Sequence, residues 1–233
     1  MKFDKIIRGL FFLMMIQNVN MLFAQDVNVI EQTINPAGII DELPMPPPSL
    51  EGNVYLLEDW DKGTVDMKNG QSINEGLYVN YDLQNDLLEL KFADKVKVCT
   101  PMLLKKFTTE NKYGNIKYYE NISNYDKSKL GILEIVYSKG SSIFAIQPYV
   151  FIQKPNYVPT MDVGNKNNKV FRKANYYLIK DGNLIPFKNS KKGIKNLTGS
   201  NYSEVEKYIK KLSINLKEEA ELSKLMRYYI NLL

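Results

Sequence analysis

Alternating apolar and polar residues dominate residues 77–92, and the pattern predicts two paired strands. One face would carry Leu77, Val79, Tyr81 and Leu83, followed by Leu88, Leu90 and Phe92. The opposite face would carry Tyr78, Asn80, Asp82 and Gln84, followed by Glu89 and Lys91. Because successive strand residues point to opposite faces, this pattern is typical of a half-buried antiparallel hairpin. We therefore expect the polar face, with Asp82 and Glu89, to lie in solvent.

Strand and turn signals alternate from residue 52 to about residue 187. The candidate strands are 63–68, 71–83, 87–93, 95–100, 103–109, 113–122, 130–138, 142–153, 169–180 and 183–187. Turn sequences rich in Gly and Asn lie at 68–70, 84–86, 138–142 and 180–183. Such residues adopt positive φ readily, and connections this short require antiparallel neighbours. Residues 155–168 have no periodic apolar pattern, and we expect an exposed loop there.

The apolar period changes to that of a helix near the C-terminus. One stripe holds Val205, Tyr208, Ile209 and Leu212, and a second holds Leu222, Leu225, Met226, Tyr229, Ile230 and Leu233. These stripes predict two amphipathic helices that dock on the sheet. Ser203 with Glu206, and more weakly Asn215 with Glu218, have the spacing of capping boxes. A shorter helix is expected near 190–197, ending around Gly199.

The N-terminus has the pattern of a secretory signal peptide. Lys2, Lys5 and Arg8 precede a short apolar core at 9–16, and "LFAQ" follows at 22–25. This predicts a signal peptide over 1–24, cleaved after Ala24. The alternative is a membrane anchor, but polar residues interrupt the apolar run well before the ~20 residues that a span needs. We therefore expect an exported chain with no transmembrane segment after cleavage.

The mature chain is expected to hold a leader and one domain. Residues 25–50 contain five prolines and predict an extended leader, since proline is excluded from central strands. Residues 51–233 would form the single domain, with an antiparallel sheet over 51–187 and a helical tail over 188–233. The formal net charge of +5 is mild, and together with export it argues against a nucleic-acid partner.

The absence of histidine excludes several chemistries. With no His and one Cys, the chain lacks the ligands of ordinary zinc sites and the partners of Ser–His or Cys–His nucleophiles. It has no glycine-rich phosphate loop. We assign no catalytic residue, no metal and no cofactor. The single Cys99 cannot form an intramolecular disulfide, and we expect it to be buried and inert, although intermolecular pairing is the alternative.

Carboxylates offer the one remaining route to catalysis. Glu58, Asp59 and Asp61 surround Trp60, and paired carboxylates beside an aromatic ring are what glycosidases use. Neighbouring strand residues point to opposite faces, however, so adjacency is weak support for a working pair. The favoured interpretation is that Trp60 anchors the first strand in the core while the acids occupy a solvated turn.

A basic run precedes the last helices and is the one candidate contact surface. It consists of Lys188, Lys191, Lys192 and Lys195. Such a run can contact anionic lipid headgroups or an anionic glycan surface. The competing interpretation is an ordinary solvated face.

Four segments resemble a group of small exported proteins of Gram-negative bacteria. They are "GNVYLLEDWDKGTV" at 52–65, "YVNYDLQNDLLEL" at 78–90, "ANYYLIKDGNLIPFKNSKKGIKNL" at 174–197 and "KYIKKLSINLKEEAELSKLMRYYINLL" at 207–233. The resemblance implies export and a strand meander followed by a lysine-rich helical tail. It implies no activity and no catalytic residue.

The predicted fold class is α+β, with a curved antiparallel β-meander or partly open barrel closed by two or three C-terminal helices. The leading functional hypothesis is a non-catalytic binding or assembly protein of the bacterial cell envelope, periplasmic or associated with the outer membrane, with an envelope protein as partner. One alternative is a carrier that holds a lipid or another amphiphile in a concave sheet. The other is a carboxylate-dependent enzyme that acts on a saccharide.

Overall fold

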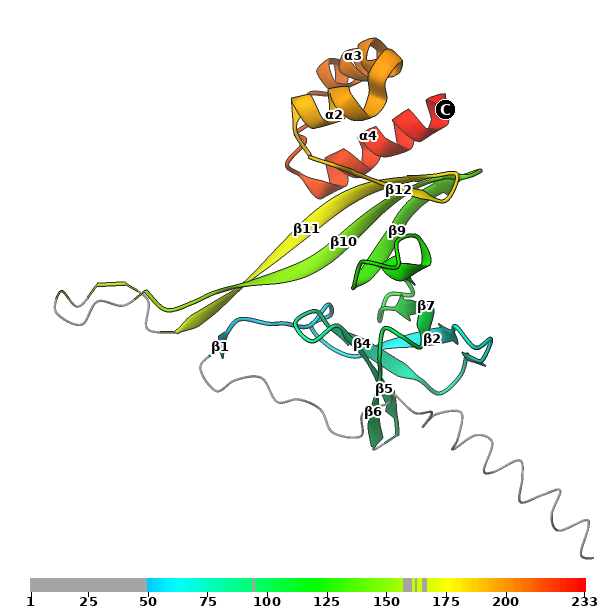
Figure 1. The fold of residues 1–233 in the computed structure, drawn as a ribbon, viewed down its shortest axis with the longest axis vertical. Helices are drawn as coiled ribbons and strands as arrows, with labels where there is room; N and C mark the ends of the chain where they lie inside the picture. The colour runs from blue at the N-terminus through cyan, green and yellow to red at the C-terminus, as the bar shows by residue number, and fades with distance from the viewer. Residues whose placement is uncertain (1–49, 94, 157–160, 162, 165–166) are drawn as a thin grey trace, which may run out of the picture. The chain divides into compact units, whose positions relative to one another are not determined.

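The computed structural model describes residues 50–93, 95–156, 161, 163–164 and 167–233 (Figure 1). The predicted signal peptide at 1–24 and nearly all of the predicted leader at 25–50 lie outside the described residues. So do parts of the expected loop at 155–168. The single domain predicted for 51–233 is described almost completely.

The described residues form twelve strands and three α-helices (Figure 1). The strands are β1 (Leu50–Glu51), β2 (Asp61–Met67), β3 (Ser72–Ile73), β4 (Tyr78–Asp82), β5 (Leu87–Phe92), β6 (Lys95–Cys99), β7 (Leu104–Glu110), β8 (Ile116–Asn121), β9 (Ile132–Lys139), β10 (Ser142–Gln153), β11 (Asn168–Lys180) and β12 (Asn183–Phe187). The helices are α2 (Lys191–Thr198), α3 (Tyr202–Leu212) and α4 (Glu219–Leu232).

All the strands belong to one open, mostly antiparallel sheet. Its order is β1-β11-β10-β9-β8-β7-β2-β4-β5-β6, with β12 beside β11 and β3 beside β2. Consecutive strands from β7 to β12 pair in sequence, as do β4 to β6, which confirms the predicted meander. Three pairings join strands that are not consecutive in the sequence: β2 pairs with β4 and with β7, and the short β1 pairs in parallel with β11.

The C-terminal helices cover one end of the sheet, as predicted. Eight helical residues form one core cluster with Phe144, Ile146 and Leu178 of the strands: Ile194, Val205, Ile209, Leu222, Leu225, Met226, Tyr229 and Ile230. Helix α4 packs on β9 and β10 (Figure 1). Two residues of the predicted stripes lie outside this core, because Leu212 is 50% exposed and Leu233 is 47% exposed.

The helix boundaries confirm one predicted signal and correct two. Helix α2 begins after Ser190, whose hydroxyl accepts the Gly193 N–H at 3.1 Å, and ends at Gly199 with φ 52°. The capping box of Ser203 with Glu206 is wrong. A 3-10 turn over Gly199–Asn201 runs directly into α3, so Ser203 already lies inside the helix.

The second predicted capping box is also replaced by other hydrogen bonds. The Asn215 side chain accepts the Lys217 N–H at 3.1 Å. The carboxylate that accepts the Asn215 N–H belongs to Glu221, one turn beyond the predicted Glu218. Spacing alone therefore identified the residue that opens the turn but not its partner.

The polar face of the β4–β5 hairpin is buried, which contradicts the prediction. Asn80, Asp82 and Glu89 are 5%, 2% and 3% exposed. The cause is the segment before β2, which pairs alongside β4: the Leu56 N–H donates to the Tyr81 carbonyl at 2.8 Å. The Asn80 amide oxygen also accepts the Leu57 N–H at 3.1 Å. The hairpin is therefore buried on both faces around Asn80, Asp82 and Glu89.

Asn80, Asp82 and Glu89 each have a hydrogen-bond partner. Asp82 accepts the N–H groups of Gln84 and Asn85 at 2.8 and 3.0 Å, and so closes the turn of the hairpin. Tyr55 donates its phenolic hydrogen to Glu89. Burial and the Glu89 carboxylate raise the pKa of Tyr55 to about 12, so the phenol keeps its proton at neutral pH.

We expect Glu89→Gln to stabilise the protein at pH 7. Burial raises the pKa of Glu89 above its ordinary value, and the nearby Asp82 charge raises it further, against the hydrogen bond from Tyr55. Ionised Glu89 therefore costs folding free energy, and that cost disappears as the pH falls through the raised pKa towards the ordinary value. A neutral amide keeps an acceptor for Tyr55 and avoids the cost.

The expected gain in unfolding free energy is about 0.5–2 kcal/mol, the usual size of a stabilising substitution. Urea unfolding of both proteins between pH 5 and pH 8 measures it. The native protein should gain stability on acidification across this range more than the variant does. Equal stability at pH 7 together with parallel pH profiles would mean that Glu89 is not strained.

Candidate functional site

The predicted basic run lies on the surface of the helical tail. Lys188 precedes α2, while Lys191, Lys192 and Lys195 belong to it, and all four are exposed. Lys195 places its ammonium 5.7 Å from the centroid of the Tyr202 ring. The four lysines do not line the three hollows on the face of β2, β7 and β8. Their contact with an anionic surface stays a prediction.

Trp60 is not part of the core, so that prediction is wrong. The residue is half-buried and stands just before β2, which begins at Asp61. Because Trp60 precedes the paired strand, the sheet does not carry its ring inward. The Lys91 ammonium lies 5.7 Å from the centroid of the Trp60 ring. Glu58 and Asp59 are exposed, as predicted.

The outer face of β2, β7 and β8 carries an ordered polar patch. Directly opposite residues on β2 and β7 form the pairs Lys62–Glu110, Thr64–Thr108 and Asp66–Lys106. On β8, Ile116, Tyr118 and Glu120 continue the same three rows. Residues paired directly across strands share a face. The three rows therefore present nine side chains on one side of the sheet.

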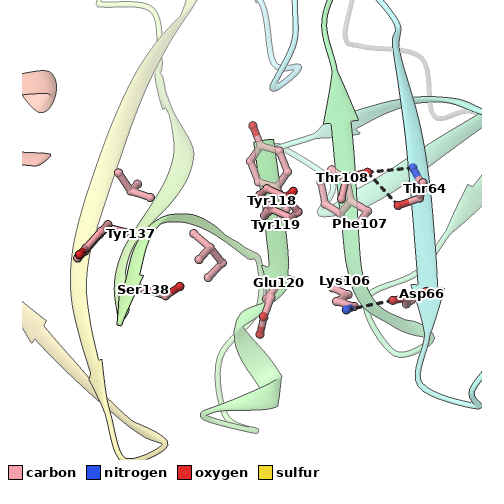
Figure 2. Close-up of a pocket in the computed structure, with 12 residues that line it drawn as sticks. Thr64, Asp66, Lys106, Phe107, Thr108, Tyr118, Tyr119, Glu120, Tyr137 and Ser138 are labelled. Carbon is pink, nitrogen blue, oxygen red and sulfur yellow. Dashed lines mark hydrogen bonds and ion pairs between the residues drawn. The ribbon is translucent and has the colours of Figure 1, made fainter. Parts of the chain in front are cut away.

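Contacts between β2 and β7 fix the two rows nearest the hollow shown in Figure 2. The hydroxyl oxygens of Thr64 and Thr108 lie 2.9 Å apart, and the Lys106 ammonium lies 3.3 Å from the Asp66 carboxylate. Asp66 also accepts the Ser72 hydroxyl. That hydrogen bond and, less strongly, Lys106 hold the pKa of Asp66 below its ordinary value. Asp66 is therefore an ionised anchor and is unsuited to act as an acid at neutral pH.

The sheet splits beside this patch. Strands β8 and β9 pair only through Tyr119–Asn121 and Ile132–Glu134. Beyond that contact the two strands separate. Residues 135–139 of β9 run along β10, where Val136 forms a bulge, and residues 116–118 of β8 run along β7. Residues 116–118 of β8 and residues 135–139 of β9 face each other, and within the described chain no strand lies between these two edges. We call this opening the β8–β9 gap.

The β8–β9 gap is a hollow of about 510 Å³. Tyr137 and Ser138 lie on one side of it, and Tyr118 and Glu120 lie on the other (Figure 2). Tyr118 is 56% exposed. The floor between β8 and β2 is formed by the Thr64, Asp66, Lys106 and Thr108 side chains. The hollow thus combines polar side chains with two strand edges.

Two further hollows extend the same face. The second, of about 360 Å³, shares Thr64 and Thr108 with the β8–β9 gap. The third, of about 700 Å³, shares Lys62, Tyr78 and Glu110 with the second and reaches Trp60. The first two hollows are lined by four acids and two lysines: Asp66, Glu75, Glu110 and Glu120, with Lys62 and Lys106. The lining is net acidic although the whole chain is basic.

Sequence reasoning missed this patch because the strands that form it are distant in the chain. Nothing local indicates that β2 lies beside β7, some forty residues later. A signal was present, since Lys62, Thr64 and Asp66 alternate with apolar Val65 and Met67, and β7 alternates in part likewise. Alternation predicts a polar face but not its neighbour.

The described residues offer little for catalysis. No cluster of three or more carboxylates and cysteines among them could hold a metal ion. Cys99 is fully buried, as predicted, and burial raises the pKa of its thiol to about 11. The thiolate needed for nucleophilic attack is therefore scarce at neutral pH. Within the described part of the chain, no helix is both long and apolar enough to cross a membrane.

No protein-family model matches the chain, and neither the curated proteins nor the solved structures include a match. The resemblance to small exported proteins of Gram-negative bacteria therefore stays a prediction.

Proposed function

We propose that this protein is a non-catalytic binding protein of the bacterial cell envelope, which holds an extended segment of a partner protein in the β8–β9 gap. One observation carries the proposal: two strand edges of the same sheet face each other across a hollow of about 510 Å³. The envelope location rests on the signal-peptide pattern of residues 1–24.

Open strand edges favour an extended ligand. A strand edge presents N–H and C=O groups that a neighbouring chain can pair with, and proteins normally cover or shorten such edges. Here Ile116–Tyr118 on β8 are paired with β7 on one side only, and the stretch from Ile135 to Lys139 on β9 is paired with β10 on one side only. An inserted segment would complete the sheet, with main-chain hydrogen bonds giving affinity and alternate side chains giving selectivity.

The lining defines the chemistry of the segment. Four carboxylates and two ammonium groups line this hollow and the next, so positive charge on the partner is favoured. Threonine hydroxyls and tyrosine rings add polar contacts. An apolar lipid tail would have to desolvate these groups without replacing their hydrogen bonds, which is unfavourable. This observation favours a basic peptide over an amphiphile.

A synthetic hexapeptide of alternating lysine and valine tests the proposal. Fluorescence polarisation measures its affinity, and hydrogen exchange locates it. We expect slower exchange at amides of 116–118 and 135–138 on binding, because an added strand pairs with these edges. A peptide with the same composition and N-methylated backbone amides should bind at least about tenfold more weakly, a difference of ~1.4 kcal/mol.

Two matched variants locate the site. Ser138→Lys places a long cationic side chain in the gap, and Ser138 is exposed, so folding should be unaffected. Ser203→Lys makes the same change on the exposed surface of α3. We expect at least about a tenfold loss of affinity for the first and none for the second. Binding without protection of either edge, or equal effects of the two variants, would overturn the proposal.

A further inference from the structure

The third hollow is a second site with a different composition. It is lined by residues 57–62 before and at the start of β2, by Tyr78 of β4, and by residues 110–114, where β7 turns into β8. Its volume is about 700 Å³, within the range of ligand pockets. We call it the Trp60 groove. It does not include the strand edges on which the proposed peptide site depends.

Three aromatic rings from separate elements line the Trp60 groove. Trp60 is half-buried, Tyr78 is 42% exposed and Tyr113 is 77% exposed. The Tyr113 turn is held by Asn111, whose side-chain oxygen accepts the N–H of Tyr113 at 2.9 Å and that of Asn115 at 3.1 Å. The exposed ring of Tyr113 therefore stands on a hydrogen-bonded turn.

Two of the three rings, those of Trp60 and Tyr113, already have a lysine ammonium group of the protein over them. The Lys91 ammonium lies 5.7 Å from the Trp60 centroid, and the Lys112 ammonium lies 5.3 Å from the Tyr113 centroid. Both distances are within the range of cation–π attraction. A cationic ligand would compete with these lysines and be repelled by them. The rings are therefore better suited to a neutral ligand that packs flat against an aromatic face.

Hydrogen-bond acceptors surround the same rings. The carboxylates that line the groove are Glu58, Asp59, Asp61 and Glu110. Ionised carboxylates only accept hydrogen bonds, so they match ligand hydroxyl groups, which donate. They also repel an anionic ligand, such as a uronic acid. Two lysines, Lys62 and Lys112, supply donors for ligand oxygens.

We infer that the Trp60 groove binds a neutral oligosaccharide. A pyranose ring has one face of C–H groups, which packs on an aromatic ring, and a rim of hydroxyls, which both donate and accept hydrogen bonds. The groove holds aromatic rings for the C–H face and carboxylates and lysines for the hydroxyls. Glycan binding in the Trp60 groove is independent of peptide capture in the β8–β9 gap.

Trp60 is the only tryptophan of the chain, so its fluorescence reports on this site alone. A glycan microarray with neutral, uronic-acid and sialylated oligosaccharides identifies a probe, and titration of that probe follows Trp60 emission. We expect neutral oligosaccharides to bind and to shift the emission to shorter wavelength, because the ligand displaces water from the indole.

Tyr113→Ala should weaken binding at least about tenfold without changing the melting temperature, since the ring is mostly exposed. Met102→Ala is the control, because Met102 is 83% exposed and does not line the groove. No glycan bound, a preference for anionic glycans, or binding insensitive to Tyr113→Ala would overturn the inference. A Trp60 shift produced by the lysine–valine peptide but by no glycan would assign the groove to a peptide.

Discussion

Removal of residues 200–233 is expected to leave an insoluble protein. The deletion takes away seven buried side chains of α3 and α4, each worth about 1.5–3 kcal/mol when buried. It exposes their partners on the sheet and on α2, among them Phe144, Leu178 and Ile194. An apolar surface of this kind favours self-association over a folded monomer. Expression followed by size-exclusion chromatography and thermal melting measures the outcome.

A charge variant distinguishes the loss of the buried apolar side chains of α3 and α4 from the loss of the exposed lysines of α3. Lys207, Lys210 and Lys211 are exposed on α3, and their replacement by glutamine keeps the core cluster intact. The triple variant should remain monomeric and melt cooperatively, like the native protein. A truncated chain that stays monomeric with a cooperative transition would show that the tail is an appendage to an independently stable sheet.

The elements that sequence predicted well are those whose signals are local. The pairs β9–β10 and β11–β12 follow from two strand-forming runs joined by a short glycine turn. The helices follow from stripes of period 3.6, and Gly199 ends α2 as its position predicted. Helix starts were less predictable. Ser203 has the right spacing for a cap, but the preceding 3-10 turn had already provided helical geometry.

The elements that sequence missed depend on non-local pairing. A strand with one polar face is expected to be half-exposed, and Asp82 and Glu89 fit that expectation until another segment pairs beside them. That segment is irregular and has an isolated bridge from Tyr55 to Asp82, so no alternation marked it as a strand. Trp60 was misplaced for the same reason, because its position depends on where the paired part of β2 begins.

In the candidate site, too, local sequence signals predict part of the structure and non-local strand pairing determines the rest. The alternation in β2 and in part of β7 predicts polar faces, and the structure joins them into one patch through the Thr64–Thr108 and Asp66–Lys106 pairs. The β8–β9 gap has no counterpart in the sequence pattern. The mostly apolar run of β9 continues past the point at which its partner β8 diverges, so the sequence looks like that of a fully paired strand. Unpaired edges are a property of strand arrangement.

Side chains on both faces of the β4–β5 hairpin are buried, so substitutions on either face should destabilise the protein. Leu90→Ala should lower the unfolding free energy by about 2–5 kcal/mol, because Leu90 is fully buried in the cluster with Val79 and Tyr81. Leu130→Ala is the matched control, since the same side chain is 71% exposed there, and its effect should stay below about 0.5 kcal/mol.

The opposite face of the hairpin should respond as well. Asp82→Ala should lower the unfolding free energy by about 1–3 kcal/mol, because it leaves the N–H groups of Gln84 and Asn85 without their acceptor in a partly buried turn. Urea unfolding of the three variants measures all the differences under one condition. A loss for Leu90→Ala alone, with Asp82→Ala as harmless as Leu130→Ala, would return Asp82 to the solvent face that the sequence pattern suggests. Losses for both mean that the two faces of the hairpin both contribute to stability in solution.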